Sequence, residues 1–107
     1  MARPEPRQLV VIAKRQVTPN MLRITLGGAG MAAFPEDQAS AYIKLRVPDA
    51  SAGREVVRTY TVRSHRADEI DVDFALHEEC GPATLWALNA QAGDSIMVGG
   101  PGPRKLV

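Results

Sequence analysis

A short stretch in the second half of the chain groups side chains that suit a ligand with phosphate and aromatic parts. Arg58, Tyr60 and Thr61 lie within the run RTYTVR at residues 58–63. Alternate residues of a strand project to the same face, so we expect Arg58 and Tyr60 on one face and Thr61 and Arg63 on the other. A guanidinium binds phosphate oxygens, a tyrosine ring stacks on flat ligands, and a threonine hydroxyl donates and accepts hydrogen bonds. The alternative is ordinary strand composition.

A second candidate group stands at the start of a predicted helix. Gly81, Pro82, Ala83 and Thr84 follow a predicted strand that ends at His77. A helix N-terminus presents unpaired N–H groups and a partial positive charge, and glycine lets a ligand approach the backbone closely. Together with Arg58, this group predicts a two-sided grip on a pyrophosphate. The alternative is that Gly81 and Thr84 only cap the helix.

Hydrophobic alternation and turn residues predict mostly strands. A period of two is clearest at residues 70–77, and proline at position 82 is suited to the first turn of a helix that continues to Ala90. The expected strands are residues 9–17, 21–26, 41–47, 56–64, 70–77 and 95–98. With no alternating helices, this pattern predicts an all-β fold, a six-stranded antiparallel Greek-key barrel with one short helix before the last strand.

Composition excludes several classes of protein. The 107 residues suffice for one small domain, and a net charge of +1 gives no electrostatic case for nucleic acid or an anionic membrane as partner. Cys80 is the single cysteine, so no internal disulfide is possible. The first apolar run, residues 9–13, is too short for a signal peptide or a membrane span. We therefore expect a cytoplasmic protein.

Metal and acid–base chemistry are not expected. The irregular spacing of His65, His77 and Cys80 does not match a structural zinc site. We expect the neighbouring carboxylates to form a solvated strand face: Asp71, Asp73, Glu78 and Glu79. No residue of this chain is expected to be catalytic, because a redox cofactor carries its own chemistry.

Three motifs, in this order and at this spacing, resemble the FAD-binding domain of siderophore-interacting proteins. They are RTYTVR at 58–63, DVDFALH at 71–77 and GPATLWA at 81–87. Proteins of that family are NAD(P)H-dependent ferric-siderophore reductases within the ferredoxin-reductase superfamily. The resemblance runs over essentially the whole chain. It departs from the family at Glu78-Glu79, where glycine is common, and at Thr84, where serine is commoner.

The resemblance implies roles for individual residues. Arg58 would bind the FAD pyrophosphate, Tyr60 would stack on the isoalloxazine ring, and Thr61 would hydrogen-bond that ring. His77 would lie along the cofactor, and Arg63 would either reach it or be a solvated strand residue. The phosphate-side loop and helix start would be formed by Gly81, Pro82, Ala83 and Thr84.

The implied function is that of an FAD-binding module passing electrons from flavin to Fe(III) of a ferric siderophore. Residues 1–107 would form the FAD domain. Family members continue into a nicotinamide-binding domain, which we expect to be absent from this chain and to provide the contacts with NAD(P)H and the siderophore. Two alternatives stay open at this point: the FAD domain of another ferredoxin-reductase-like oxidoreductase, and a non-enzymatic β-barrel binding module.

Overall fold

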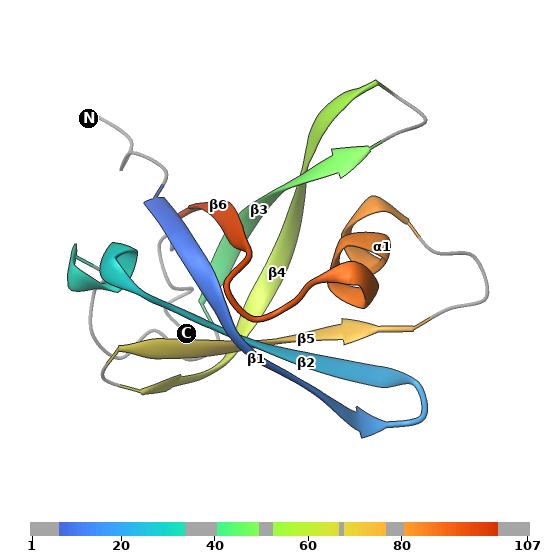
Figure 1. Cartoon of the computed structure of the whole chain (residues 1–107), viewed down its shortest axis with the longest axis horizontal. Coiled ribbons are helices and arrows are strands. Elements are labelled where there is room, and N and C mark those ends of the chain that lie inside the picture. The colour runs from blue at the N-terminus through green and yellow to red at the C-terminus, as the bar shows by residue number, and fades with distance from the viewer. Residues whose placement is uncertain (1–6, 34–40, 50–52, 67, 77–80, 101–107) are drawn as a thin grey trace, which may run out of the picture.

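Six antiparallel strands close into a barrel in the computed structural model, which describes residues 7–33, 41–49, 53–66, 68–76 and 81–100 (Figure 1). Neighbouring strands follow the order β1-β2-β5-β4-β3-β6. Strands β3, β4 and β5 are consecutive neighbours and β6 returns to lie beside β3, which is a Greek key. The predicted fold class is confirmed. In chain order the elements are β1 (Arg7–Thr18), β2 (Met21–Gly27), the 3-10 helix η1 (Ala29–Ala33), β3 (Tyr42–Asp49), β4 (Arg54–Arg66), β5 (Glu69–Ala75), α1 (Pro82–Asn89) and β6 (Ser95–Gly99).

The barrel interior is built from alternate residues of the strands. In β2, Leu22, Ile24 and Leu26 are buried and alternate with the less buried Arg23 and Thr25. The same period places Ile70, Val72 and Phe74 of β5 in the core, each fully buried. Burying these side chains is the main favourable contribution to folding, at roughly 1.5–3 kcal/mol for each large apolar side chain.

Strand β4 changes partners along its length. Its residues Arg54 to Thr61 pair with β3, whereas its pairing with β5 runs only from Val62 to Arg66. Figure 1 shows β3 and β4 rising together away from β5, and α1 lies between this pair of strands and β5. Among the described residues, the edge of β4 opposite β3 therefore has no strand partner over residues 54–61. We call residues 54–61 the open half of β4.

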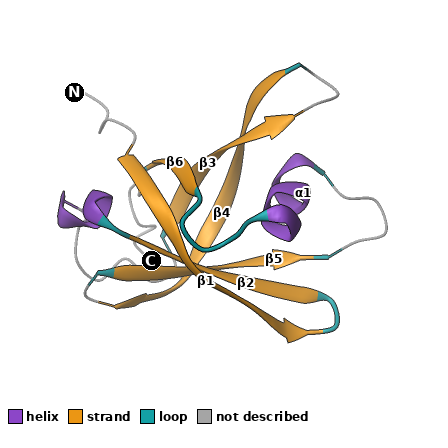
Figure 2. Ribbon diagram, viewed as in Figure 1, coloured by secondary structure: helices purple, strands orange, loops and turns teal. Residues whose placement is uncertain are grey.

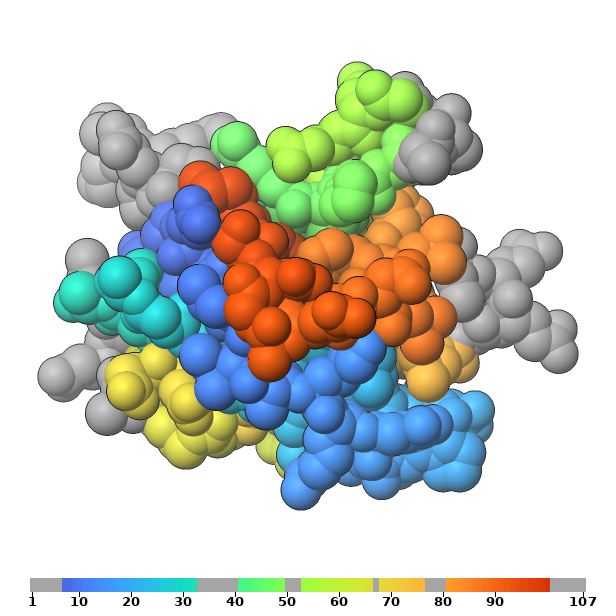
Figure 3. Space-filling view, in the orientation of Figure 1, coloured from blue at the N-terminus to red at the C-terminus, as the bar shows by residue number. Residues whose placement is uncertain are grey.

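Helix α1 packs against the barrel chiefly on β3 and also on β5 and β2. Its buried residues are Ala83, Thr84 and Ala87, whereas Leu85 and Leu88 stay 49% and 42% exposed. The small side chains let the helix approach the strands closely. Figure 2 shows α1 as the helix at the right of the view, and Figure 3 shows it filling the surface next to β3. Within the described residues, no helix is long and apolar enough to cross a membrane.

Candidate functional site

Tyr60 lies on the inner side of β4, where its ring is held by other aromatic rings. The Tyr60 and Phe74 ring centroids are 4.6 Å apart, and those of Phe74 and Trp86 are 6.0 Å apart. Phe74 is fully buried, while Tyr60 and Trp86 are half-buried and pack against the core. Trp86 therefore packs its ring between α1 and the barrel core. This row of rings fixes the plane of Tyr60 at the end of the barrel.

The hydroxyl of Tyr60 links the strand motif to the helix start. Burial raises the pKa of Tyr60, while a hydrogen bond with Thr84 and the charge of Arg58 act in the opposite direction. Thr84 is buried, and its hydroxyl donates to the carbonyl of Ala75 at 3.4 Å. The two motifs, 23 positions apart in sequence at Arg58 and Gly81, thus converge on one place.

Arg58 is an exposed cation without a carboxylate partner among the described residues. Its Nη1 donates to the neighbouring carbonyl of Val57 at 3.0 Å. The charge of Arg58 is close enough to Tyr60 to lower the pKa of that phenol. An arginine in this state can donate its remaining N–H groups to an anion without first breaking an ion pair.

Thr61 and Arg63 take the opposite face of β4, as predicted. Both are exposed, whereas Val62 between them is fully buried. Arg63 Nε lies 3.7 Å from Asp73 Oδ2 on the outside of the barrel. The structure therefore does not bring Arg63 together with Arg58 and Tyr60. Thr61 is the last residue of the open half of β4, directly after Tyr60, with its side chain on the outer face.

The start of α1 is open. Gly81 is the N-cap residue, is exposed and has an extended backbone, and no side chain of the described residues caps the helix. A Cβ atom added at Gly81 would meet no atom of those residues within 4 Å. Pro82 occupies the first turn, and Ala83 is buried with Thr84. Because the Thr84 hydroxyl donates to Ala75, its role is to tie α1 to β5. The N–H groups of the first turn are thus not covered by a capping side chain.

His77, the remaining predicted site residue, lies outside the described residues, as do Glu78, Glu79 and Cys80.

The outside of the barrel corrects one expectation. Asp71 is only 6% exposed, not part of a solvated face. Its carboxylate accepts hydrogen bonds from Arg66 at 2.8 and 3.0 Å, from Thr25 at 2.7 Å and from Ser64 at 2.7 Å. Arg66 above all, then Thr25 and Ser64, hold the pKa of Asp71 well below its usual range. This network joins β2, β5 and β4, and the alternation pattern gave no signal for it.

Comparisons with known proteins agree with this arrangement. The family model described as siderophore-interacting FAD-binding domain matches residues 10–57 and 50–105. Ferric vibriobactin reductase ViuB of Vibrio cholerae is 38% identical over 91% of this chain and 43% of the relative. A ferric acinetobactin reductase of Acinetobacter baumannii is 40% identical over 57% of this chain and 22% of the relative.

A solved structure shows the same fold. The crystal structure of the siderophore-interacting protein SipS from Aeromonas hydrophila superposes with a TM-score of 0.78 and 36% identity. The match covers 92% of this chain and 43% of that one. The chain thus spans less than half the length of ViuB and SipS.

Proposed function

The chain belongs to the family of siderophore-interacting FAD-binding domains. We propose that Arg58, Tyr60 and the start of α1 hold FAD beside the open half of β4. We further propose that it is the FAD module of an NAD(P)H-dependent ferric-siderophore reductase. The observation that carries the proposal is the contact between Tyr60 and Thr84, which joins the strand motif to the start of α1, with the charge of Arg58 acting on the same tyrosine. Each of these residues could be explained alone by folding, but a cation, a ring and an uncapped helix start joined in this way suit a flavin dinucleotide.

The residues present fit FAD. Arg58 has no carboxylate partner among the described residues, Gly81 has open space in front of it, and the ring of Tyr60 is fixed by Phe74. Arg58 and the N–H groups at the helix start would bind the pyrophosphate from two sides. Tyr60 would stack on the flavin ring, and Thr84 would orient Tyr60 through its hydroxyl.

Thr61, Pro82 and Ala83 have narrower proposed roles. Thr61 lies at the end of the open half of β4, where a ligand that reaches around the strand edge would meet its hydroxyl. Pro82 and Ala83 shape the helix start: Pro82 has no N–H to leave unpaired, and Ala83 is buried against the barrel. Arg63 faces the outside with Asp73, which favours a structural contact for it over a cofactor contact.

Bound there, FAD would supply the redox chemistry that links NAD(P)H to ferric iron, and the chain would bind, orient and electronically tune it. The chain covers 43% of ViuB and of SipS, so we propose that the contacts with NAD(P)H and with the ferric siderophore are made by a further, nicotinamide-binding domain. NAD(P)H is a cytoplasmic reductant, so this reaction would place the protein in the cytoplasm.

Titration of the purified chain with FAD and with FMN, followed by flavin fluorescence, tests the proposal. We expect tighter binding of FAD, because only FAD has a pyrophosphate to use both Arg58 and the helix start. Bound FAD is also expected to give the protein a yellow colour with a shifted visible spectrum. Equal or tighter binding of FMN would contradict the proposed two-sided site.

A further inference from the structure

Two arginines face each other on the outside of the barrel. Arg15 of β1 is the direct cross-strand neighbour of Arg23 of β2. Like charges directly opposite in an antiparallel pair are destabilising unless something compensates them. Arg15 is exposed and has no ion-pair or hydrogen-bond partner within the described part of the chain. No contact among the described residues therefore explains the charge of Arg15.

The carboxylates nearby are already engaged. Asp73 receives Arg23 Nε at 2.7 Å and a terminal nitrogen of Arg23 at 3.0 Å. Asp71 receives four hydrogen bonds, two of them from Arg66, which also contacts Glu69 at 3.2 Å. None of these contacts uses Arg15, and Arg23 keeps its Nη1 group free of them. Arg15 and one nitrogen of Arg23 are therefore left without an acceptor from these carboxylates.

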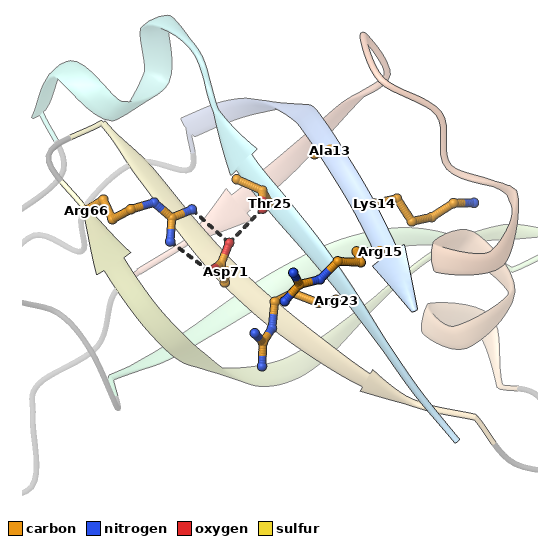
Figure 4. A pocket seen from close by; sticks show the side chains of 7 residues that line it. All are labelled: Ala13, Lys14, Arg15, Arg23, Thr25, Arg66 and Asp71. Atoms are coloured by element: carbon orange, nitrogen blue, oxygen red, sulfur yellow. Dashed lines mark hydrogen bonds and ion pairs between the residues drawn. The ribbon is translucent and has the colours of Figure 1, made fainter. Parts of the chain in front are cut away.

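These two arginines line a hollow of about 310 Å³, together with Thr25, Arg66 and Asp71 (Figure 4). Figure 4 shows the side chains of Arg15 and Arg23 extending on the same side, whereas Lys14 extends toward the helix. The ammonium of Lys14 donates to the carbonyl of Leu88 at 2.9 Å, so its charge lies at the C-terminal end of α1. The hollow therefore holds a net positive charge, which comes from Arg15, because Arg23 and Arg66 are paired with carboxylates.

We propose that this hollow binds an oxyanion of the phosphate type between Arg15 and Arg23. The planar fork of Arg15 would bind two oxygens, and Nη1 of Arg23 would bind a third, an arrangement that guanidinium groups favour. Asp73 holds the Arg23 guanidinium in place for this contact. The hollow lies on the outer face of β1 and β2, separate from Tyr60 and the helix start, so it does not depend on the proposed flavin site.

An NMR titration of the 15N-labelled chain with sodium phosphate tests this, with sodium chloride at equal ionic strength as the reference. We expect saturable shifts at residues 13–15, 23 and 25 and in the side-chain N–H signals of both arginines. Changes at residues 81–84 report the other proposed site and are followed separately. Arg15→Gln should weaken phosphate binding in the hollow about tenfold or more, since a charged fork is lost. The matched control is Arg46→Gln, which removes an exposed arginine from β3. It should change the phosphate affinity less than about twofold.

Two further experiments identify the kind of anion that binds and check that the variant is folded. Glycerol phosphate in place of inorganic phosphate shows whether an esterified phosphate is accepted, and sodium acetate shows whether a carboxylate suffices. Thermal unfolding in low-salt buffer without phosphate should show Arg15→Gln to be at least as stable as the original chain, because a repulsion is removed. Equal phosphate binding by the original chain and Arg15→Gln would overturn the site. Chloride shifts that match those of phosphate would also overturn it.

Discussion

The two halves of β4 hold arginines in opposite circumstances. In the open half of β4, Arg58 has no carboxylate partner among the described residues, and its charge acts on Tyr60. In the half that pairs with β5, Arg66 binds both Asp71 and Glu69. An arginine neutralised by neighbours stabilises the strands that it joins, whereas an arginine left without a partner is available to an anionic ligand. The difference therefore separates a structural role from a binding role within one strand.

The same contrast holds for the groups around each arginine. Near Arg58 stand aromatic rings, with Phe74 buried beneath Tyr60. Near Arg66 stand the short hydroxyl side chains of Thr25 and Ser64, both donating to Asp71. Aromatic rings offer a flat surface to a ligand. The two hydroxyl groups, in contrast, already donate their protons to the Asp71 carboxylate. If this contrast is correct, substitutions in the open half of β4 should chiefly weaken FAD binding. Substitutions around Arg66 should chiefly lower the free energy of unfolding.

The largest effect on stability is expected from Asp71→Ala. The change leaves Thr25, Ser64 and Arg66 without their acceptor. Losing a buried charged acceptor of this kind costs about 2–4 kcal/mol of the free energy of unfolding. Urea unfolding measures the loss, with the exposed Asp68→Ala as control at less than about 0.5 kcal/mol. FAD affinity of the folded variant should stay unchanged, and a large loss of affinity would break the separation of roles.

The pH dependence of stability sharpens the same comparison. The pKa of Asp71 is lowered in the folded protein, chiefly by Arg66. Its contribution to stability is therefore complete above the unfolded-state pKa of about 3.9, and is lost as the pH falls from there toward the folded-state value. The difference in unfolding free energy between the original chain and Asp71→Asn should be constant from about pH 7 to pH 5 and smaller at about pH 3. A difference that does not shrink at pH 3 would argue against this network.

A smaller effect is expected from Tyr60→Phe, which keeps the ring and removes the bond to Thr84. The loss should be about 0.5–1.5 kcal/mol in unfolding free energy, with FAD binding weakened a few-fold. Combining it with Thr84→Val in a double-mutant cycle should give clearly non-additive losses, because both changes remove one contact. Tyr42→Phe, at an exposed tyrosine of β3, is the control. Additive losses would show that the two side chains act independently.

The smallest expected effect belongs to Lys14→Gln, which lies in neither half of β4. The ammonium of Lys14 donates to the carbonyls of Leu88 and Ala87 at the end of α1. A cation at a helix C-terminus contributes about 0.3–1 kcal/mol, and the contribution falls with added salt. Thermal unfolding at low and high salt measures it. A loss that is the same at both salt concentrations would mean that the charge is not what matters.

The fold followed closely from the sequence, and so did the distribution of residues 58–63 between the two faces of β4. Alternation in residues 70–77 and Pro82 at the helix start predicted β5 and α1 nearly to their observed bounds, because both are local signals. The assignment of Arg58 and Tyr60 to one face and of Arg63 to the other was confirmed for the same reason. The site roles of these residues, and of His77 outside the described residues, stay predictions.

Features that depend on long-range contacts did not follow from the sequence. The bonds of Asp71 with Thr25 and Arg66 require the register of three strands, which no local pattern specifies. The side of α1 that is buried was also not apparent. Leu85 and Leu88 suggest an apolar contact by their spacing, yet both are exposed, and the helix packs through Ala83 and Ala87.

The most direct test of the proposed flavin site compares Arg58→Ala with Arg63→Ala in FAD binding, followed by flavin fluorescence. These arginines lie five positions apart on β4, one without a carboxylate partner among the described residues and the other 3.7 Å from Asp73. Loss of a charge-assisted phosphate contact costs about 1.5–3 kcal/mol, so Arg58→Ala should weaken FAD binding about tenfold or more. Arg63→Ala should change it less than about twofold. Equal effects of the two substitutions would contradict FAD binding at the open half of β4.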